Sequence, residues 1–151
     1  MRERLAALLL TLPNVKIGGQ AGTAPQAIAA IAERRPDVVI LDISMPGGSG
    51  LDVLRAVKRT APSTVVIVLT MHPYQQLGAG CAAAGADVYF EKNAEFGRLA
   101  AVLGLLGRSS RSQAALRRLL QRYGAATNAG ARAVSPRVAS PLRTPSLPAA
   151  I

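Results

Sequence analysis

The sequence predicts an α/β fold in which a parallel sheet is covered by helices on both faces. Two short runs, Val38–Leu41 and Val65–Leu69, are apolar and rich in β-branched residues, which is typical of strands buried on both faces. Segments with helical spacing of apolar residues alternate with these runs, and this alternation favours a parallel sheet. Ligands of such sheets bind beyond the carboxyl ends of the strands, so a functional site is expected there.

The individual elements follow from local signals along the chain. Pro13 ends the first helix and Pro36 the second, because proline cannot continue a helix interior. Thr23 is the expected N-cap of the second helix, and Pro25 lies near its first turn. We expect helices over Arg2–Leu12, Ala24–Arg34, Leu51–Arg59, Pro73–Ala84 and Ala94–Leu106, and strands over Val15–Gln20, Val38–Leu41, Val65–Leu69 and Ala86–Phe90.

The positive charge lies mostly in the last third of the chain. The 151 residues carry a formal charge of +10, but residues 1–106 hold all eight acids and account for only +2. We therefore expect a domain over 1–106, a short basic helix within 107–123 and a disordered tail rich in Ala, Pro, Arg and Ser over 124–151. The tail predicts weak polyanion binding, whereas the scarcity of aromatic residues argues against specific nucleic-acid recognition.

Two further features concern the compartment. The single cysteine, Cys81, excludes an internal disulfide and suits a reducing environment. The longest apolar runs are shorter than the roughly 18 residues that a membrane-spanning helix needs. We expect a cytoplasmic protein without a membrane partner.

Three polar residues come at or just after the ends of predicted strands. Asp42 follows Val38–Leu41, Thr70 follows Val65–Leu69, and Lys92 comes shortly after the last strand. Taken singly, each has an ordinary interpretation: a capping aspartate, a β-branched strand residue and a solvated loop lysine. Together they place a nucleophilic or metal-binding carboxylate beside a hydroxyl donor and an ammonium group that can pair with phosphate.

These residues lie in motifs that resemble the receiver domain of bacterial two-component response regulators. The motifs are Asp42-Ile43-Ser44-Met45-Pro46 with Gly50, then Thr70 at a strand end, then the run from Gly85 to Lys92. They occur in the order of that family and cover residues 1 to about 106. The resemblance implies a flavodoxin-like, doubly wound sheet with strand order 2-1-3-4-5.

The resemblance also implies a role for each site residue. Asp42 would be the phosphoacceptor, Lys92 would hold the phosphoryl group, and Thr70 and Tyr89 would form the switch that responds to it. The backbone carbonyl of Ser44 would join Asp42 in binding Mg²⁺. Met45 and Pro46 would shape the loop, and Gly50 would permit its tight turn.

The sequence departs from the family at its beginning. Receivers start with an apolar first strand that ends in an acidic pair holding Mg²⁺, whereas this chain starts at the first helix, and only Glu3 precedes Glu33 among its acids. We therefore expect weak Mg²⁺ binding and two strands that each lack a neighbour. A reading frame that begins further upstream is the preferred explanation; a decayed gene and a strand from a partner chain are the alternatives.

The predicted function is that of a phosphorelay receiver module, a phosphoprotein of a two-component system and not an enzyme. Its partners would be a histidine kinase or phosphotransfer protein and a downstream protein target. The alternative is a pseudo-receiver or gene fragment that binds proteins without accepting phosphate. A phosphotransferase-type hydrolase with a nucleophilic Asp42 is disfavoured, because Ser44 stands where such enzymes carry a second acid.

Overall fold

The computed structural model describes residues 2–93, 96–108, 118 and 148–150. Its main element is a five-stranded sheet in the order β1-β7-β2-β5-β6, in which every paired strand is parallel to its neighbour. The strands of this sheet are β1 (Lys16–Gly19), β2 (Val38–Leu41), β5 (Val65–Thr70), β6 (Val88–Glu91) and β7 (Pro148–Ala150). The helices are α1 (Arg2–Leu10), α2 (Ala24–Arg34), α3 (Gly50–Thr60), α4 (Tyr74–Ala83) and α5 (Phe96–Arg108).

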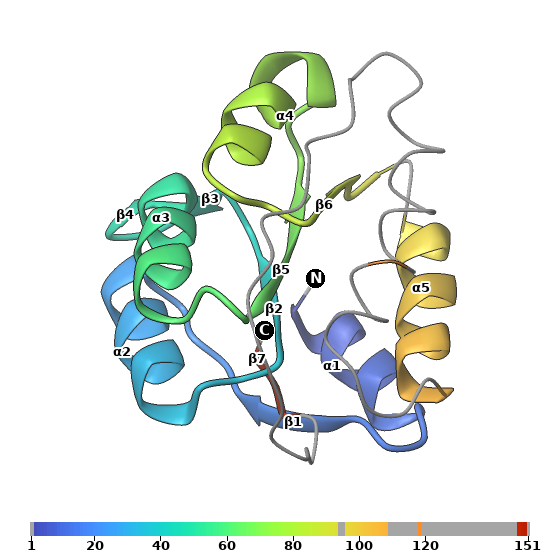
Figure 1. Ribbon diagram of the computed structural model, residues 1–151. Coiled ribbons are helices and arrows are strands. Elements are labelled where there is room, and N and C mark those ends of the chain that lie inside the picture. Colours follow the sequence, from blue (N-terminus) through green and yellow to red (C-terminus); the bar gives the residue numbers. More distant parts are fainter. Residues whose placement is uncertain (1, 94–95, 109–117, 119–147, 151) are drawn as a thin grey trace.

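Helices cover both faces of the sheet, as the apolar strands predict. Figure 1 shows α1 and α5 on one side and α2 and α3 on the other. Alternate residues of each strand point to opposite faces. In β2, Val38 and Ile40 pack in the cluster that contains Leu99 of α5, whereas Val39 and Leu41 pack in the cluster on the other face. The predicted doubly covered α/β sheet is therefore confirmed.

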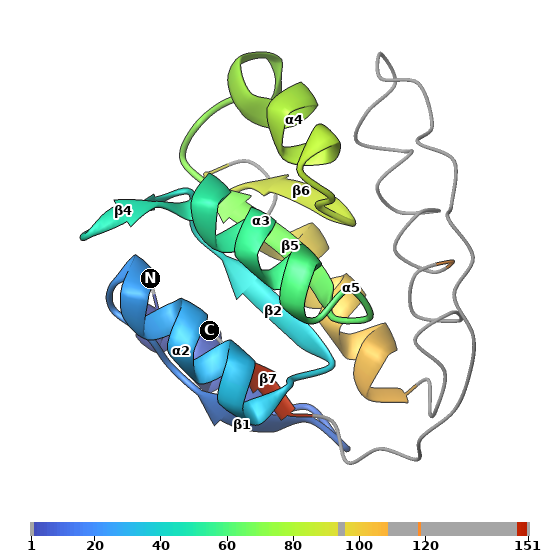
Figure 2. The ribbon, with the colours of Figure 1, turned by 60° about the vertical axis from the view of Figure 1, so that its left-hand side comes forward.

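The C-terminal strand β7 occupies the position between β1 and β2. Figure 2 shows it as the red arrow beside β1. Its residues pair with β1 from Lys16 to Gly19 and with Val38 and Val39 of β2. With β7 counted in the place of the family's first strand, the spatial order matches the order 2-1-3-4-5 that the resemblance implied.

The structure differs from two expectations at this point. The tail over 124–151 was expected to lack regular structure, yet Pro148–Ala150 form a strand. The strands on either side were expected to lack a neighbour, yet both pair with β7. The physical reason is the same for both: unpaired backbone N–H and C=O groups inside a sheet are costly, and almost any extended segment can pair with them. The remaining tail residues, and all of the predicted basic helix beyond Arg108 except residue 118, lie outside the described residues.

Most other predicted elements agree with the structure to within two residues at each end. Ala24–Arg34 and Val38–Leu41 agree at both ends, and the Thr23 hydroxyl caps α2 by accepting from the N–H of Gln26. One pair of elements was not predicted. Residues Ser44–Met45 (β3) and Gly48–Ser49 (β4) form a two-stranded antiparallel hairpin where the sequence suggested a loop.

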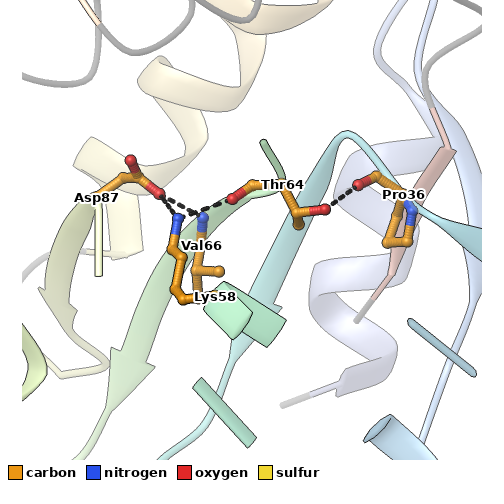
Figure 3. Close-up of polar contacts among 5 residues, drawn as sticks. All are labelled: Pro36, Lys58, Thr64, Val66 and Asp87. Atoms are coloured by element: carbon orange, nitrogen blue, oxygen red, sulfur yellow. Dashed lines mark hydrogen bonds and ion pairs between the residues drawn. The ribbon is translucent and has the colours of Figure 1, made fainter. Parts of the chain in front are cut away.

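A polar cluster fastens the end of α3 to the sheet (Figure 3). The Lys58 ammonium donates to the Asp87 carboxylate at 2.6 Å and to the Thr64 carbonyl at 2.8 Å. The same Asp87 oxygen accepts from the backbone N–H of Val66 at 2.8 Å. The Thr64 hydroxyl donates to the Pro36 carbonyl at 2.8 Å, which links the starts of β5 and β2. These contacts hold three adjacent strands in register at the end opposite to Asp42.

Candidate functional site

The three polar residues predicted at the strand ends lie on three adjacent strands. Asp42 follows β2, Thr70 is the last residue of β5, and Lys92 follows β6. Because these strands are parallel and neighbouring, their carboxyl ends meet at one edge of the sheet. The backbone N–H of Lys92 donates to the Thr70 carbonyl at 2.8 Å, which extends the ladder of β5 and β6 by one bond.

Asp42 is held in place by one backbone donor and one ammonium group. The N–H of Ser44 donates to its Oδ1 at 3.1 Å, an Asx-type contact that orients the carboxylate at the strand end. The Nζ of Lys92 donates to its Oδ2. The Asp42 side chain keeps 32% of its surface exposed, whereas Lys92 keeps only 12%. The carboxylate is thus accessible to a reacting partner, and its counter-ion is largely buried behind it.

Thr70 and Ser44 are linked through His72. The Thr70 hydroxyl is fully buried and accepts from the backbone N–H of His72 at 3.4 Å. The Nε2 of His72 lies 2.8 Å from the Ser44 hydroxyl, which itself is two residues after Asp42. His72 is not among the residues singled out from the sequence, although the structure places it between Thr70 and Ser44. Its position two residues after Thr70 was the available signal.

Tyr89 is buried beneath the same loop. Its hydroxyl donates to the His72 carbonyl at 2.6 Å, and its ring meets the Tyr74 ring edge to face at a centroid distance of 5.3 Å. Burial raises the pKa of the Tyr89 phenol to about 12, with smaller contributions from neighbouring groups, Cys81 first among them. Burial also raises the pKa of the Cys81 thiol. Tyr89 therefore stays protonated and serves as a donor that fixes the loop after β5.

Three glycines shape the loop after Asp42, and two of them, Gly47 and Gly48, were not singled out from the sequence. Gly47 and Gly48 have φ values of 77° and 149°, so they make the turn of the hairpin between β3 and β4. Gly50 was expected to permit the tight turn before the third helix, and its φ does not lie in the left-handed region. It is required for space: a Cβ on Gly50 would lie 2.3 Å from the Asp42 carbonyl oxygen. The Pro46 carbonyl accepts from the N–H of Ala24 at 3.0 Å, which ties the loop to α2.

The described residues fit the family's metal only in part. Receiver domains generally use Mg²⁺ at the phosphorylation site, and such hard cations prefer several oxygen ligands. Within the described part of the chain, no three acidic, His or Cys side chains come together as a metal-binding group. Asp42 supplies one carboxylate, and that carboxylate is already paired with Lys92. The donor set is therefore too small for a site of the family's type, and the Ser44 carbonyl as a ligand stays a prediction.

Comparison with known proteins agrees with this geometry. A profile of the family described as the response regulator receiver domain matches residues 1–104. The chain belongs to the response regulator receiver family. Among solved structures, the response regulator domain of Thermotoga maritima CheB superposes with a TM-score of 0.63 at 25% identity, over 72% of this chain and 85% of that one.

Curated relatives share the receiver region with this chain. A protein-glutamate methylesterase/protein-glutamine glutaminase of Agrobacterium fabrum is 44% identical over 47% of this chain and 20% of its own length. The response regulator UvrY of Escherichia coli is 32% identical over 62% of this chain and 43% of its own length. The chain thus spans less than half of these relatives. None of the described helices is long and apolar enough to cross a membrane.

Proposed function

We propose that Asp42 is the phosphoacceptor of this receiver module and that Lys92, Thr70 and Tyr89 respond to its phosphorylation. The observation that carries the proposal is the ion pair between Asp42 and Lys92, which joins the ends of β2 and β6 across Thr70 at the end of β5. An accessible carboxylate beside a largely buried ammonium and a buried hydroxyl suits a group that gains negative charge during its reaction.

The proposed donor is a phosphohistidine of a histidine kinase or phosphotransfer protein. An Asp42 carboxylate oxygen attacks the phosphorus, and a new O–P bond forms while the P–N bond of the phosphohistidine breaks. The departing imidazole nitrogen keeps the electron pair of that bond and takes a proton. Asp42 then carries an acyl phosphate with a charge of roughly −2 in place of −1. The Lys92 ammonium stays beside it, so we expect the added charge to strengthen this pairing.

The loop contacts provide a route from Asp42 to Tyr89. Ser44 is bonded to the His72 ring, and the His72 carbonyl holds the Tyr89 hydroxyl. A phosphoryl group on Asp42 would compete for the hydroxyl of Thr70 and for the N–H groups next to it. We expect His72 to shift and release the Tyr89 hydroxyl, which changes the surface between β6 and α4. That surface would meet a downstream protein target.

Phosphorylation is expected to be slow. The charge of the incoming phosphoryl group is offset chiefly by Lys92, because the described residues supply one carboxylate for a cation. The matched relative is named as a methylesterase, but this chain covers only 20% of its length. We therefore propose a signalling module and not an enzyme, with the pseudo-receiver as the second candidate, favoured by the small donor set.

Acetyl phosphate is a suitable chemical donor for the test. Incubation of the full chain with acetyl phosphate and Mg²⁺ should add the mass of one phosphoryl group, stable in acid and labile in base. Asp42→Asn should abolish the gain completely. Asp52→Asn is the matched control, since Asp52 is an exposed aspartate on α3 that pairs with Arg55, and it should leave the gain unchanged. Absence of any gain in the unsubstituted chain would reject the phosphoacceptor role and leave the pseudo-receiver.

A further inference from the structure

A serine and a histidine form a hydrogen-bonded pair beside Asp42. The hydroxyl of Ser44 lies 2.8 Å from Nε2 of the His72 ring. The two residues come from different parts of the chain, because Ser44 begins β3 and His72 lies between β5 and α4. A serine hydroxyl within hydrogen-bond reach of an imidazole nitrogen is the arrangement that activates a serine as a nucleophile. The pair therefore has a chemical use besides its place on the route from Asp42 to Tyr89.

The histidine of this pair is held in place, and the serine is accessible. The backbone N–H of His72 donates to the Thr70 hydroxyl at 3.4 Å, and its carbonyl accepts from the Tyr89 hydroxyl at 2.6 Å. His72 is partly buried, whereas Ser44 is exposed. In the tautomer with the proton on Nδ1, the Nε2 lone pair accepts the hydrogen bond of the serine hydroxyl. A proton acceptor is thus fixed beside a hydroxyl oxygen that a reacting phosphorus can approach.

The Ser44 hydroxyl is also close to the place of a phosphoryl group on Asp42. The backbone N–H of Ser44 donates to Oδ1 of Asp42 at 3.1 Å, and both residues line the same cavity as Lys92. The Lys92 ammonium donates to Oδ2 of Asp42, so it can offset charge on phosphoryl oxygens that pass between the two acceptors. A nucleophile held beside its electrophile reacts as if it were present at a very high concentration.

We propose that Ser44 is a second phosphorylation site, to which the phosphoryl group passes from Asp42 with His72 as the general base. The Ser44 Oγ attacks the phosphorus and forms a new O–P bond, while the O–P bond to Asp42 breaks and the carboxylate leaves with the electron pair. The hydroxyl proton passes to Nε2 of His72 and from there to water. The inference rests on the proposed phosphorylation of Asp42, because that acyl phosphate supplies the phosphoryl group.

The transfer would turn a short-lived modification into a lasting one. An acyl phosphate is a mixed anhydride that water hydrolyses readily, whereas the uncatalysed hydrolysis of a phosphate monoester is among the slowest reactions known. The phosphoserine carries a charge of roughly −2, and Asp42 regains its carboxylate. The site therefore keeps its added negative charge beside Lys92 after Asp42 has lost the phosphoryl group. Transfer takes place while the His72 ring still contacts Ser44, before the shift that releases Tyr89.

The test separates the two phosphorylated forms by their stability to hydroxylamine, which cleaves an acyl phosphate and leaves a serine phosphate intact. The full chain is incubated with acetyl phosphate and Mg²⁺, the reagent is removed, and intact mass is followed over time with and without hydroxylamine. The labile gain should fall while a stable gain of the same mass rises, and fragmentation of the phosphopeptide should place the stable gain on Ser44. A labile gain that decays with no stable gain would overturn the transfer and leave the phosphoacceptor role of Asp42 standing. No labile gain at all would reject both.

Substitutions assign the two steps, and each rate is measured from the labile form of the same protein. Ser44→Ala should lose the stable gain, whereas Ser63→Ala, at an exposed serine before β5 at the opposite end of the sheet, should behave like the unsubstituted chain. His72→Gln can still accept a hydrogen bond from Ser44 but cannot take its proton, so conversion should slow at least about a hundredfold. Conversion by His72→Gln at the unsubstituted rate, or a stable gain in Asp42→Asn, would overturn the proposal.

Discussion

The two halves of the sheet are built from different kinds of strand. In the site half, formed by β2, β5 and β6, all but one of the strand residues are buried, and these strands are rich in Val, Ile and Leu. In the closing half, formed by β1 and β7, the β1 residues are all exposed or partly exposed, and the two strands consist largely of glycine and alanine. Strands of the first kind resist opening, whereas strands of the second kind bury little apolar surface.

The difference matches what each half has to do. In the proposed function, Asp42, Thr70 and Lys92 keep their relative positions to act on one phosphoryl group, and a rigid scaffold is the usual support for such a site. The closing half positions none of these three residues. Because the β1 residues are less buried than those of the site half, this half is expected to open at a lower free-energy cost. The more deeply buried half of the sheet is thus the one that positions the residues of the proposed chemistry.

An isoleucine-to-alanine substitution in each half should give the largest difference in the loss of stability. Ile67→Ala empties a fully buried position in β5 and should lower the free energy of unfolding by about 3 kcal/mol. Ile17→Ala, in β1, removes a partly exposed side chain and should cost about 1 kcal/mol. Urea unfolding followed by circular dichroism measures both. Equal losses in the free energy of unfolding would show that the two halves contribute alike to stability, which would contradict the difference described above.

Substitution of the ionic contact in Figure 3 should give a smaller effect. Asp87→Ala leaves the buried N–H of Val66 without this acceptor and takes the carboxylate from Lys58, so we expect a loss of about 2 kcal/mol. Asp52→Ala is the matched control. Its pair with Arg55 has side chains more than 60% exposed, and its removal should cost under about 0.5 kcal/mol. A loss for Asp87→Ala as small as that of the control would remove this cluster as a support of the site half.

The site half could be predicted from the sequence because its signals are local. Continuous β-branched runs indicate strands over Val38–Leu41 and Val65–Leu69, and parallel strands place Asp42, Thr70 and Lys92 at one edge. For His72, the sequence indicates only that it lies two residues after Thr70. Its contacts with Ser44 and Tyr89 depend on the path of two loops that no short-range pattern describes.

The closing half could not be predicted because its cause is tertiary. Pro148–Ala150 have no β-branched residue and no alternation, so composition alone indicates an unstructured tail. They form a strand because β1 and β2 present unpaired edges that face each other. Gly50 also has a tertiary cause. The sequence indicates a glycine near a turn, but only the structure shows that the Asp42 carbonyl leaves no room for a Cβ there.

The smallest of these effects comes from Tyr89 at alkaline pH and tests how tightly the site half is closed. The pKa of the phenol is raised to about 12 in the folded chain, chiefly by burial, from an ordinary value near 10. Between these values the unfolded chain loses the proton while the folded chain keeps it, so stability must fall as pH rises. From pH 8 to pH 11 the loss from this group should be about 1.4 kcal/mol.

Tyr89→Phe isolates this contribution, because the other titrating groups are unchanged. The variant lacks the hydrogen bond to the His72 carbonyl, so it should be less stable than the unsubstituted chain at pH 8. By pH 11 its deficit should shrink by the same 1.4 kcal/mol or so, since phenylalanine has no proton to lose. Urea unfolding of both proteins at the two pH values measures the change. A deficit that stays constant with pH would mean that Tyr89 titrates as if exposed, and that the site half is open to solvent at β6.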